Sequence, residues 1–374
     1  MGSQEKTKKT LKKEWFLVAG SLIVISLVLL FLFREKPAVI SAPGSKSEKP
    51  LPVSKAGEPV VPDKKETQDP EQLDYKTAAN QNTISAYQEY IKKYPSGSHV
   101  REVETRIKEL QEMPEQVRKA AGKVSKVIKV EKNEKGSWEA DFGDGIIMVY
   151  IPPGKFIMGS DEDEAQSDEQ PVHEIYLEGY WMGKYEITFE QYDKYCDETQ
   201  KEKPDDGNWG RGKFPVISVS WHDALEYCKW LSAKTGFHFK LPTEAQWEKA
   251  ARGTKGQKFP WGDQNANEDL ANIKKTGELG GPVPVGSYPR GASPYGLLDM
   301  TGNVWEWCYD WYDWYKVDSP KQRENPEDIR KFNFRVLRGG CWFEEPKFVR
   351  AANRYGIRPT YRGYIAGFRL CMEN

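Results

Sequence analysis

From Trp138 to the C-terminus, the chain consists of short apolar runs separated by glycine, proline and aspartate turns. Only two stretches have convincing helical periodicity, residues 188–199 and 220–236. A shorter helix is predicted at Thr243, because Gln246 follows it at the spacing of a capping box. Long loops inside a compact domain are usually functional, or are held by ions or disulfides. The pattern therefore predicts an α+β domain with little regular secondary structure.

Eight short motifs follow one another in this part of the chain. They are "IPPGKFIMGS", "EQPVHEIYLEGYWMGKYEIT", "FPVISVSWHDALEYCKWL", "LPTEAQWEKAARG", "FPWGD", "PVGSYPRGASPYGLLDMTGNVWEWCYDWYD", "RVLRGGCW" and "AGFRL". On this ordered set, residues 138–372 resemble the formylglycine-generating enzymes, also called sulfatase-modifying factors. Those enzymes hold Cu(I) between two thiolates and oxidise a cysteine on an extended sulfatase peptide. The resemblance implies their C-type-lectin-like fold.

The segment "RVLRGGCWFEEPKFVRAANR", residues 335–354, resembles the active-site strand of that family but lacks its cysteine pair. Cys341 stands directly after the Gly-Gly pair, and Glu344 and Glu345 follow it. Cu(I) selects soft thiolate ligands, whereas carboxylates are hard ligands. We therefore expect no standard copper-dependent oxidase activity. Cys341 and Cys308 remain candidate catalytic residues for a non-standard, copper-dependent oxidase that acts on thiols.

The chain has five cysteines, and no two of them have Cys-x-x-Cys spacing. Cys308 and Cys341 are candidates for a disulfide or for a relocated soft-metal site. Cys228 resembles a helix cysteine of the family that bridges to a cysteine near the C-terminus, for which Cys371 is the candidate. Here Leu370 intervenes before Cys371, and a shift of one residue turns a strand side chain to the opposite face.

The segment "DMTGNVWEW" has the composition of a calcium loop. Asp299 and Glu306 flank a glycine-asparagine turn, and carboxylates with inward-facing carbonyls suit calcium. The resemblance implies a calcium site with the ligands Asp299, Gly302, Val304 and Glu306, and a second site that begins at Asn272 and Ile273. Glu278 is a further candidate for the second site. The alternative is a turn with capping carboxylates.

Residues 335–369 combine a net charge of +6 with many aromatic side chains. Arginine and aromatic residues are favoured at binding hot spots. This predicts a face that binds a protein, a peptide or a glycan. The residues expected to be exposed on it are Trp342, Phe343, Arg358, Tyr361 and Arg362. The alternative is that Arg338, Arg350 and Arg369 brace a loop-rich fold from within.

The N-terminal region contains an apolar run from Trp15 to Phe33, preceded by five lysines. A helix of this length would span about 28 Å, close to the hydrocarbon thickness of a bilayer. The lysines predict a cytoplasmic N-terminus. We therefore expect a bacterial, single-pass membrane protein whose bulk is periplasmic or extracellular. A cleaved signal peptide is the alternative.

Six regions are predicted along the chain. They are a basic tail (1–14), a transmembrane segment (15–33), a disordered linker (34–80), a tetratricopeptide-like helical hairpin (81–112), a basic linker (113–136) and the enzyme-like domain (137–374). One hairpin cannot form a solenoid, which needs about three repeats, so it is expected to be a spacer or a docking unit. Because 55 basic residues balance 56 acidic ones, no nucleic-acid partner is expected. Partner binding is the first functional hypothesis, a non-standard oxidase the second and a structural envelope component the third.

Overall fold

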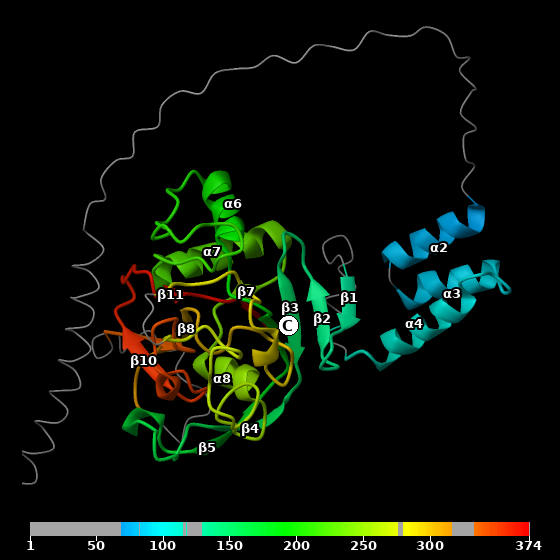
Figure 1. Ribbon diagram of the computed structural model, residues 1–374. Helices are drawn as coiled ribbons and strands as arrows, with labels where there is room; N and C mark the ends of the chain where they lie inside the picture. Colours follow the sequence, from blue (N-terminus) through cyan, green and yellow to red (C-terminus); the bar gives the residue numbers. More distant parts are fainter. Residues whose placement is uncertain are drawn as a thin grey trace, which may run out of the picture. The chain divides into compact units, whose positions relative to one another are not determined.

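The computed structural model describes residues 69–81, 83–114, 117, 129–275, 280–315 and 333–373 (Figure 1). No helix in these ranges is long and apolar enough to cross a membrane, and this finding contradicts the prediction of a single-pass membrane protein. The run for which the span was predicted, residues 15–33, lies outside the described residues.

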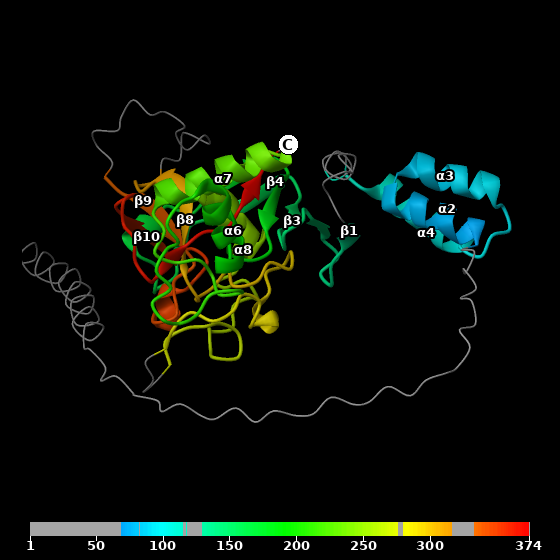
Figure 2. The same ribbon diagram turned by 90° about the horizontal axis from the view of Figure 1, so that it is seen from above.

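Three helices form the N-terminal described part, where a hairpin of two was predicted (Figure 2). They are α2 (Pro70–Gln81), α3 (Ile84–Lys93) and α4 (Val100–Glu112). The prediction of a disordered linker up to residue 80 is therefore wrong from Pro70 onward. The hydrophobic pattern did not reveal α2 because Ala78 is its one fully buried residue. Polar contacts hold it instead, since Glu71 accepts a 2.8 Å hydrogen bond from the hydroxyl of Tyr90 on α3.

Three sheets build the domain that follows, as far as the structure describes it. The first has the order β1-β2-β3-β6-β12-β7, the second β10-β9-β8-β11 and the third β4-β5. The first consists of β1 (Lys129–Lys132), β2 (Trp138–Asp141), β3 (Ile147–Ile151), β6 (Tyr180–Gly183), β12 (Cys371–Met372) and β7 (Phe239–Lys240). The others consist of β10 (Arg354–Ile357), β9 (Arg335–Arg338), β8 (Trp305–Trp311), β11 (Ala366–Gly367), β4 (Gly154–Met158) and β5 (His173–Leu177). Because β1 pairs with β2, the predicted basic linker 113–136 contains a strand of the domain.

The predicted helices of the domain are confirmed. They are α6 (Phe189–Thr199), α7 (Trp221–Thr235) and α8 (Glu244–Arg252), and each begins with a capping box. Three short 3-10 helices, η1 (Ser167–Glu169), η2 (Pro289–Gly291) and η4 (Pro346–Phe348), lie in the connecting loops. Much of the rest is irregular, as the sequence predicted.

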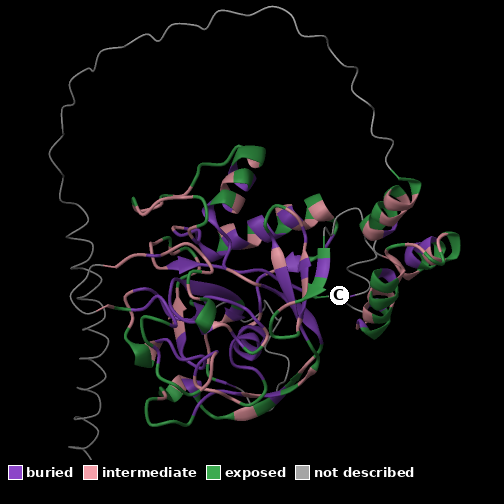
Figure 3. Cartoon of the chain, turned by 45° about the vertical axis from the view of Figure 1, so that its right-hand side comes forward, coloured by how far each residue is buried: buried purple, intermediate pink, exposed green. Residues whose placement is uncertain are grey.

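Buried arginine–glutamate pairs join the irregular segments of the domain. They are Arg338–Glu248, Arg350–Glu169, Arg354–Glu244 and Arg369–Glu306, and no member is more than 3% exposed. Buried charges are tolerated when they are paired and hydrogen-bonded. The interior of this domain, purple in Figure 3, therefore contains ion pairs as well as aromatic side chains.

Candidate functional site

Strand β9 ends in a Gly-Gly turn, which starts the segment 339–354 that the sequence singled out. Gly339 and Gly340 have φ angles of +94° and +78°, in the left-handed region that favours glycine. A Cβ atom on Gly340 would lie 2.4 Å from Cγ1 of Val349. Space and backbone conformation therefore both require glycine at position 340. The next residue, Cys341, is fully buried.

The structure does not contain the predicted disulfide between Cys308 and Cys341. Both thiols are free and fully buried, and burial raises the pKa of each well above its usual value. They lie in different core clusters, Cys341 with Trp307 and Cys308 with Trp247. Successive side chains of a strand point to opposite faces, so Trp307 and Cys308 on β8 face different clusters. The two sulfurs therefore do not share one side of the sheet.

The second candidate disulfide, Cys228–Cys371, is also absent from the structure. Cys228 on α7 packs in the same cluster as Leu370, whereas Cys371 packs in the cluster on the other side. The two thiols are close enough for the charge of Cys371 to raise the pKa of Cys228, but they are not bonded.

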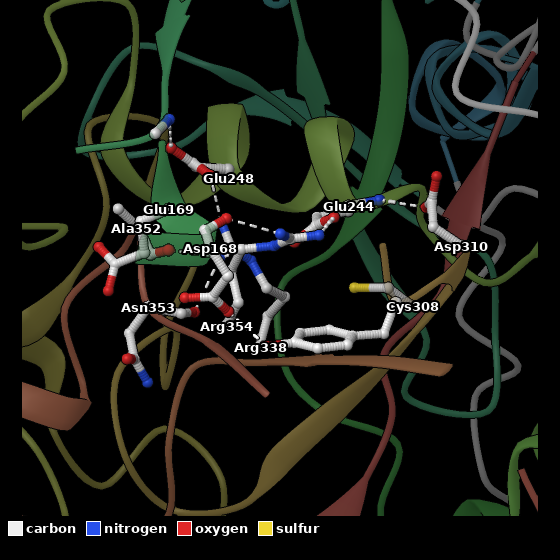
Figure 4. Close-up of polar contacts among 12 residues, drawn as sticks. Asp168, Glu169, Glu244, Glu248, Cys308, Asp310, Arg338, Ala352, Asn353 and Arg354 are labelled. Atoms are coloured by element: carbon white, nitrogen blue, oxygen red, sulfur yellow. Dashed lines mark hydrogen bonds and ion pairs between the residues drawn. The ribbon is translucent and has the colours of Figure 1, made fainter. Parts of the chain in front are cut away.

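The predicted arginine-rich face is largely internal. Five of the seven arginines between 335 and 369 are at least nine-tenths buried, namely Arg335, Arg338, Arg350, Arg354 and Arg369. Figure 4 shows Arg338 and Arg354 between the carboxylates of Glu244 and Glu248 on α8. The alternative reading, in which these arginines brace the fold, is the correct one for this group. The net charge of the segment is therefore mostly neutralised inside the domain.

The expected ligand-binding residues divide into three groups. Trp342 is only 8% exposed, so its predicted exposure is wrong. Phe343 and Tyr361 are half-buried and pack on the core. Arg358 and Arg362 are exposed as predicted, and Arg362 forms a 2.7 Å ion pair with Asp223.

Five half-buried aromatic side chains nevertheless pack against the same core cluster, and we call them the aromatic face. It consists of Trp209, Phe343, Tyr355, Tyr361 and Tyr364, all packed against one core cluster. The ring of Trp209 lies 5.5 Å from that of Tyr364 and 5.6 Å from that of the buried Trp342. Trp342 in turn lies 5.1 Å from Phe343. No described residue accepts a hydrogen bond from Nε1 of Trp342.

Glu344 lies among these aromatic residues. It is half-buried, and burial is the main cause that raises the pKa of its carboxyl group. Trp305 lies close enough to lower this pKa in part, and the carboxylate contributes to a raised pKa of Tyr355. The arrangement is an aromatic surface that contains an acidic group next to the buried thiol Cys341.

The residues implied as calcium ligands lie in two adjoining segments. Asn272 and Gly302 form an isolated parallel bridge, so a residue of one predicted site lies beside a residue of the other. Ile273 and Val304 are buried beside them. Glu278 lies outside the described residues.

Three buried acidic side chains, Glu186, Asp299 and Glu306, lie close to one described cation, Arg369. Glu306 accepts hydrogen bonds of 2.6 Å on both oxygens from Arg369, and Trp247 adds a third at 2.7 Å. Asp299 is buried, which raises its pKa to about 6. Glu186 is buried near it with a raised pKa, and no donor among the described residues reaches Oε2 of Glu186. An orphaned carboxylate oxygen beside two further acids fits a hard cation.

The side-chain geometry alone does not define a metal centre. Within the described ranges, no three histidine, cysteine, aspartate or glutamate side chains are grouped so that they could hold a metal ion. The predicted calcium set uses backbone oxygens of Gly302 and Val304, so it does not depend on such a group.

A family assignment follows from comparison with known proteins. Residues 136–374 match the family described as "Sulfatase-modifying factor enzyme 1-like domain". The chain belongs to this family. It is 37% identical over 245 residues to the serine/threonine-protein kinase pkn1 of Chlamydia caviae, a match that covers 59% of this chain and 37% of the relative. This sulfatase-modifying factor-like chain thus spans little more than a third of that relative's length, and the relative's name assigns no activity to it.

Two further matches cover a larger share of the related protein. The chain is 29% identical over 289 residues to the formylglycine-generating enzyme of Mus musculus, which covers 61% of this chain and 75% of the enzyme. The solved structure of PvdO from Pseudomonas aeruginosa matches with a TM-score of 0.55 and 28% identity, over 66% of this chain and 98% of that one. Both agree with the sulfatase-modifying factor fold.

Two residues of the site had no signal in the motifs. Trp209 lies in the glycine-rich loop "DDGNWGRG", and Glu186 follows β6 within the motif "YEIT". The aromatic residue in a long irregular loop was the available indication for Trp209. Glu186 could not be distinguished from a surface glutamate without knowledge of its burial.

Proposed function

We propose that this chain is a binding member of the sulfatase-modifying factor family and does not carry out two-thiolate copper oxidation. The observation that supports this most directly is the placement of Cys308 and Cys341 in separate core clusters, both fully buried. Copper held between two thiolates needs both sulfurs deprotonated and directed at one point. Here burial favours the neutral thiols, and the two cysteines pack in different core clusters.

The aromatic face is the surface that we assign to binding. Half-buried tyrosine, tryptophan and phenylalanine side chains offer a large contact area at a small cost in conformational entropy. Arg358 and Arg362 are exposed cations of residues 335–369. The partner class proposed for this face is a protein, a peptide or a glycan.

Calcium is proposed as a structural ion of the domain. Asp299, Gly302, Val304 and Glu306 would hold it, and its charge would offset the buried acids, Glu186 included. We expect the melting temperature of the full chain to rise when calcium replaces EDTA. The Asp299→Asn variant should lose this increase. A melting temperature that is the same in calcium and in EDTA would contradict the proposed calcium site.

A Cu(I) titration tests the proposed loss of oxidase chemistry. The reduced full chain is titrated with Cu(I) against a chromogenic chelator, alongside the variants Cys308→Ser and Cys341→Ser. We expect no one-to-one complex that competes with the chelator and no difference between the variants and the parent. Tight one-to-one binding that disappears in either variant would overturn the proposal.

A further inference from the structure

Glu344 is a partly desolvated carboxylate that forms no salt bridge within the part of the chain that the structure describes. Its neighbour Glu345 is exposed and pairs with Lys274 at 3.4 Å and with Lys347 at 3.3 Å. The charge of Lys274 is only the smallest of the influences on the pKa of Glu344. A half-buried carboxylate without a paired cation is costly, because it has lost water without regaining an opposite charge.

Four other acidic side chains show one way in which such groups are stabilised in this fold. Four buried glutamates each contact an arginine, and these are Glu169, Glu244, Glu248 and Glu306. Each of those arginines comes from the described chain itself. Glu344 differs in that it lies at the edge of the core, where a group from another molecule can reach it.

The surroundings of Glu344 also favour a cation. Phe343 precedes it, and Tyr355 lies close enough for the Glu344 charge to raise the pKa of its hydroxyl. The ring of Tyr355 lies 5.4 Å from that of Trp305, and Trp305 is also close enough to influence the pKa of Glu344. Aromatic faces attract ammonium and guanidinium groups, and the attraction increases when water is excluded. A carboxylate among such rings complements the head of a lysine or arginine side chain and the apolar stem behind it.

We infer that Glu344 and the aromatic face around it bind a basic side chain, lysine or arginine, of a partner protein. This inference rests on the proposed binding function and names the chemical group that the face recognises. An acidic or phosphorylated partner would place like charges together at Glu344. A neutral glycan would leave the carboxylate without a counter-charge. A lysine or arginine side chain pairs its charge with the carboxylate and packs against the aromatic rings.

Short capped peptides test the inference. The full chain is titrated with glycine pentapeptides whose central residue is lysine, arginine, norleucine or glutamate, and intrinsic tryptophan fluorescence is recorded. We expect saturable binding of the lysine and arginine peptides, and affinity at least tenfold weaker for the norleucine and glutamate peptides.

Two matched variants locate the effect. Glu344→Gln removes the charge but keeps the size of the side chain, and should weaken binding of the lysine peptide at least tenfold. Glu345→Gln removes the neighbouring exposed charge and should change the affinity less than twofold. Equal melting temperatures of both variants and the parent show that the fold is intact.

The outcomes separate this inference from the proposed function. Equal binding of the norleucine and lysine peptides, equal effects of the two variants, or no binding of the basic peptides would overturn the assignment of Glu344. None of these results would restore oxidase chemistry. Oxidation of a cysteine peptide to an aldehyde would instead overturn the proposed function, whatever the pentapeptides do.

Discussion

Arg350 and Glu169 lie 181 positions apart in the sequence and are joined by two hydrogen bonds of 2.7 Å, one to each carboxylate oxygen. Arg350 follows η4, and Glu169 closes η1. The same guanidinium also donates to the backbone oxygens of Lys347 and Glu164. This one side chain therefore ties the loop that carries Glu344 to a distant loop of the domain.

Removal of one charge of this pair should be strongly destabilising. In the Glu169→Gln variant, Arg350 remains buried without its counter-charge. We expect the free energy of unfolding in urea to fall by about 3–5 kcal/mol. The control Glu345→Gln breaks exposed pairs and should cost less than about 1 kcal/mol. Losses of equal size in the two variants would contradict a structural role for the buried pair.

The conformation of the Gly-Gly turn leads to a second prediction about the free energy of unfolding. Gly340→Ala places a methyl group against Val349 in addition to its left-handed backbone, and should cost about 3 kcal/mol. Gly136 has a similar φ of +76°, but a Cβ atom added there would have no neighbouring atom within 4 Å. Gly136→Ala should therefore cost only about 1 kcal/mol. Equal destabilisation in denaturant titrations would show that backbone conformation alone matters at position 340.

The thiols give a chemical test of the core. All five cysteines are free and buried, and the thiols of Cys308 and Cys341 have raised pKa values. Because the thiolate is the reactive form, alkylation of the native chain with iodoacetamide at pH 8 should be slow at every cysteine. After unfolding without reductant, mass spectrometry should find five modified cysteines. Fewer than five would indicate a disulfide and contradict the structure.

The buried carboxyl group of Asp310 should make the free energy of unfolding depend on pH. Its carboxyl group is buried and accepts a hydrogen bond from the backbone of Glu244, and burial raises its pKa to about 7 from 3.8. The unfolded chain therefore loses this proton first, and the contribution of Asp310 to stability falls as pH rises from about 4 to 7. The Asp310→Asn variant should gain about 3 kcal/mol in unfolding free energy relative to the parent between pH 5 and pH 8. A difference between variant and parent that does not change with pH would contradict this assignment.

Local signals in the sequence were sufficient for the fold class and for the three helices of the domain. The capping pairs Thr188–Gln191, Ser220–Asp223 and Thr243–Gln246 are short-range features, and each lies where the helix begins. Helix α2 was missed because polar contacts to α3, and not an apolar stripe, hold it.

The site was harder to predict because it depends on which side chains are buried. The arginines of residues 335–369 have the composition of a binding surface, yet most of them face glutamates from distant segments. Arg354 and Glu244 are 110 residues apart, so no local sequence pattern indicates that they pair. The separation of Cys308 from Cys341 depended on strand alternation, which could be applied only once the strand bounds of β8 were known.

The central claim is that this domain binds a partner and does not carry out copper-dependent oxidation. An assay of peptide turnover tests it most directly. The reduced full chain is incubated with Cu(I), oxygen and a sulfatase-type peptide that contains one cysteine, and the peptide mass is followed. The account predicts that the cysteine remains unconverted with and without copper. Conversion of the cysteine to an aldehyde at a rate that depends on added copper would contradict it.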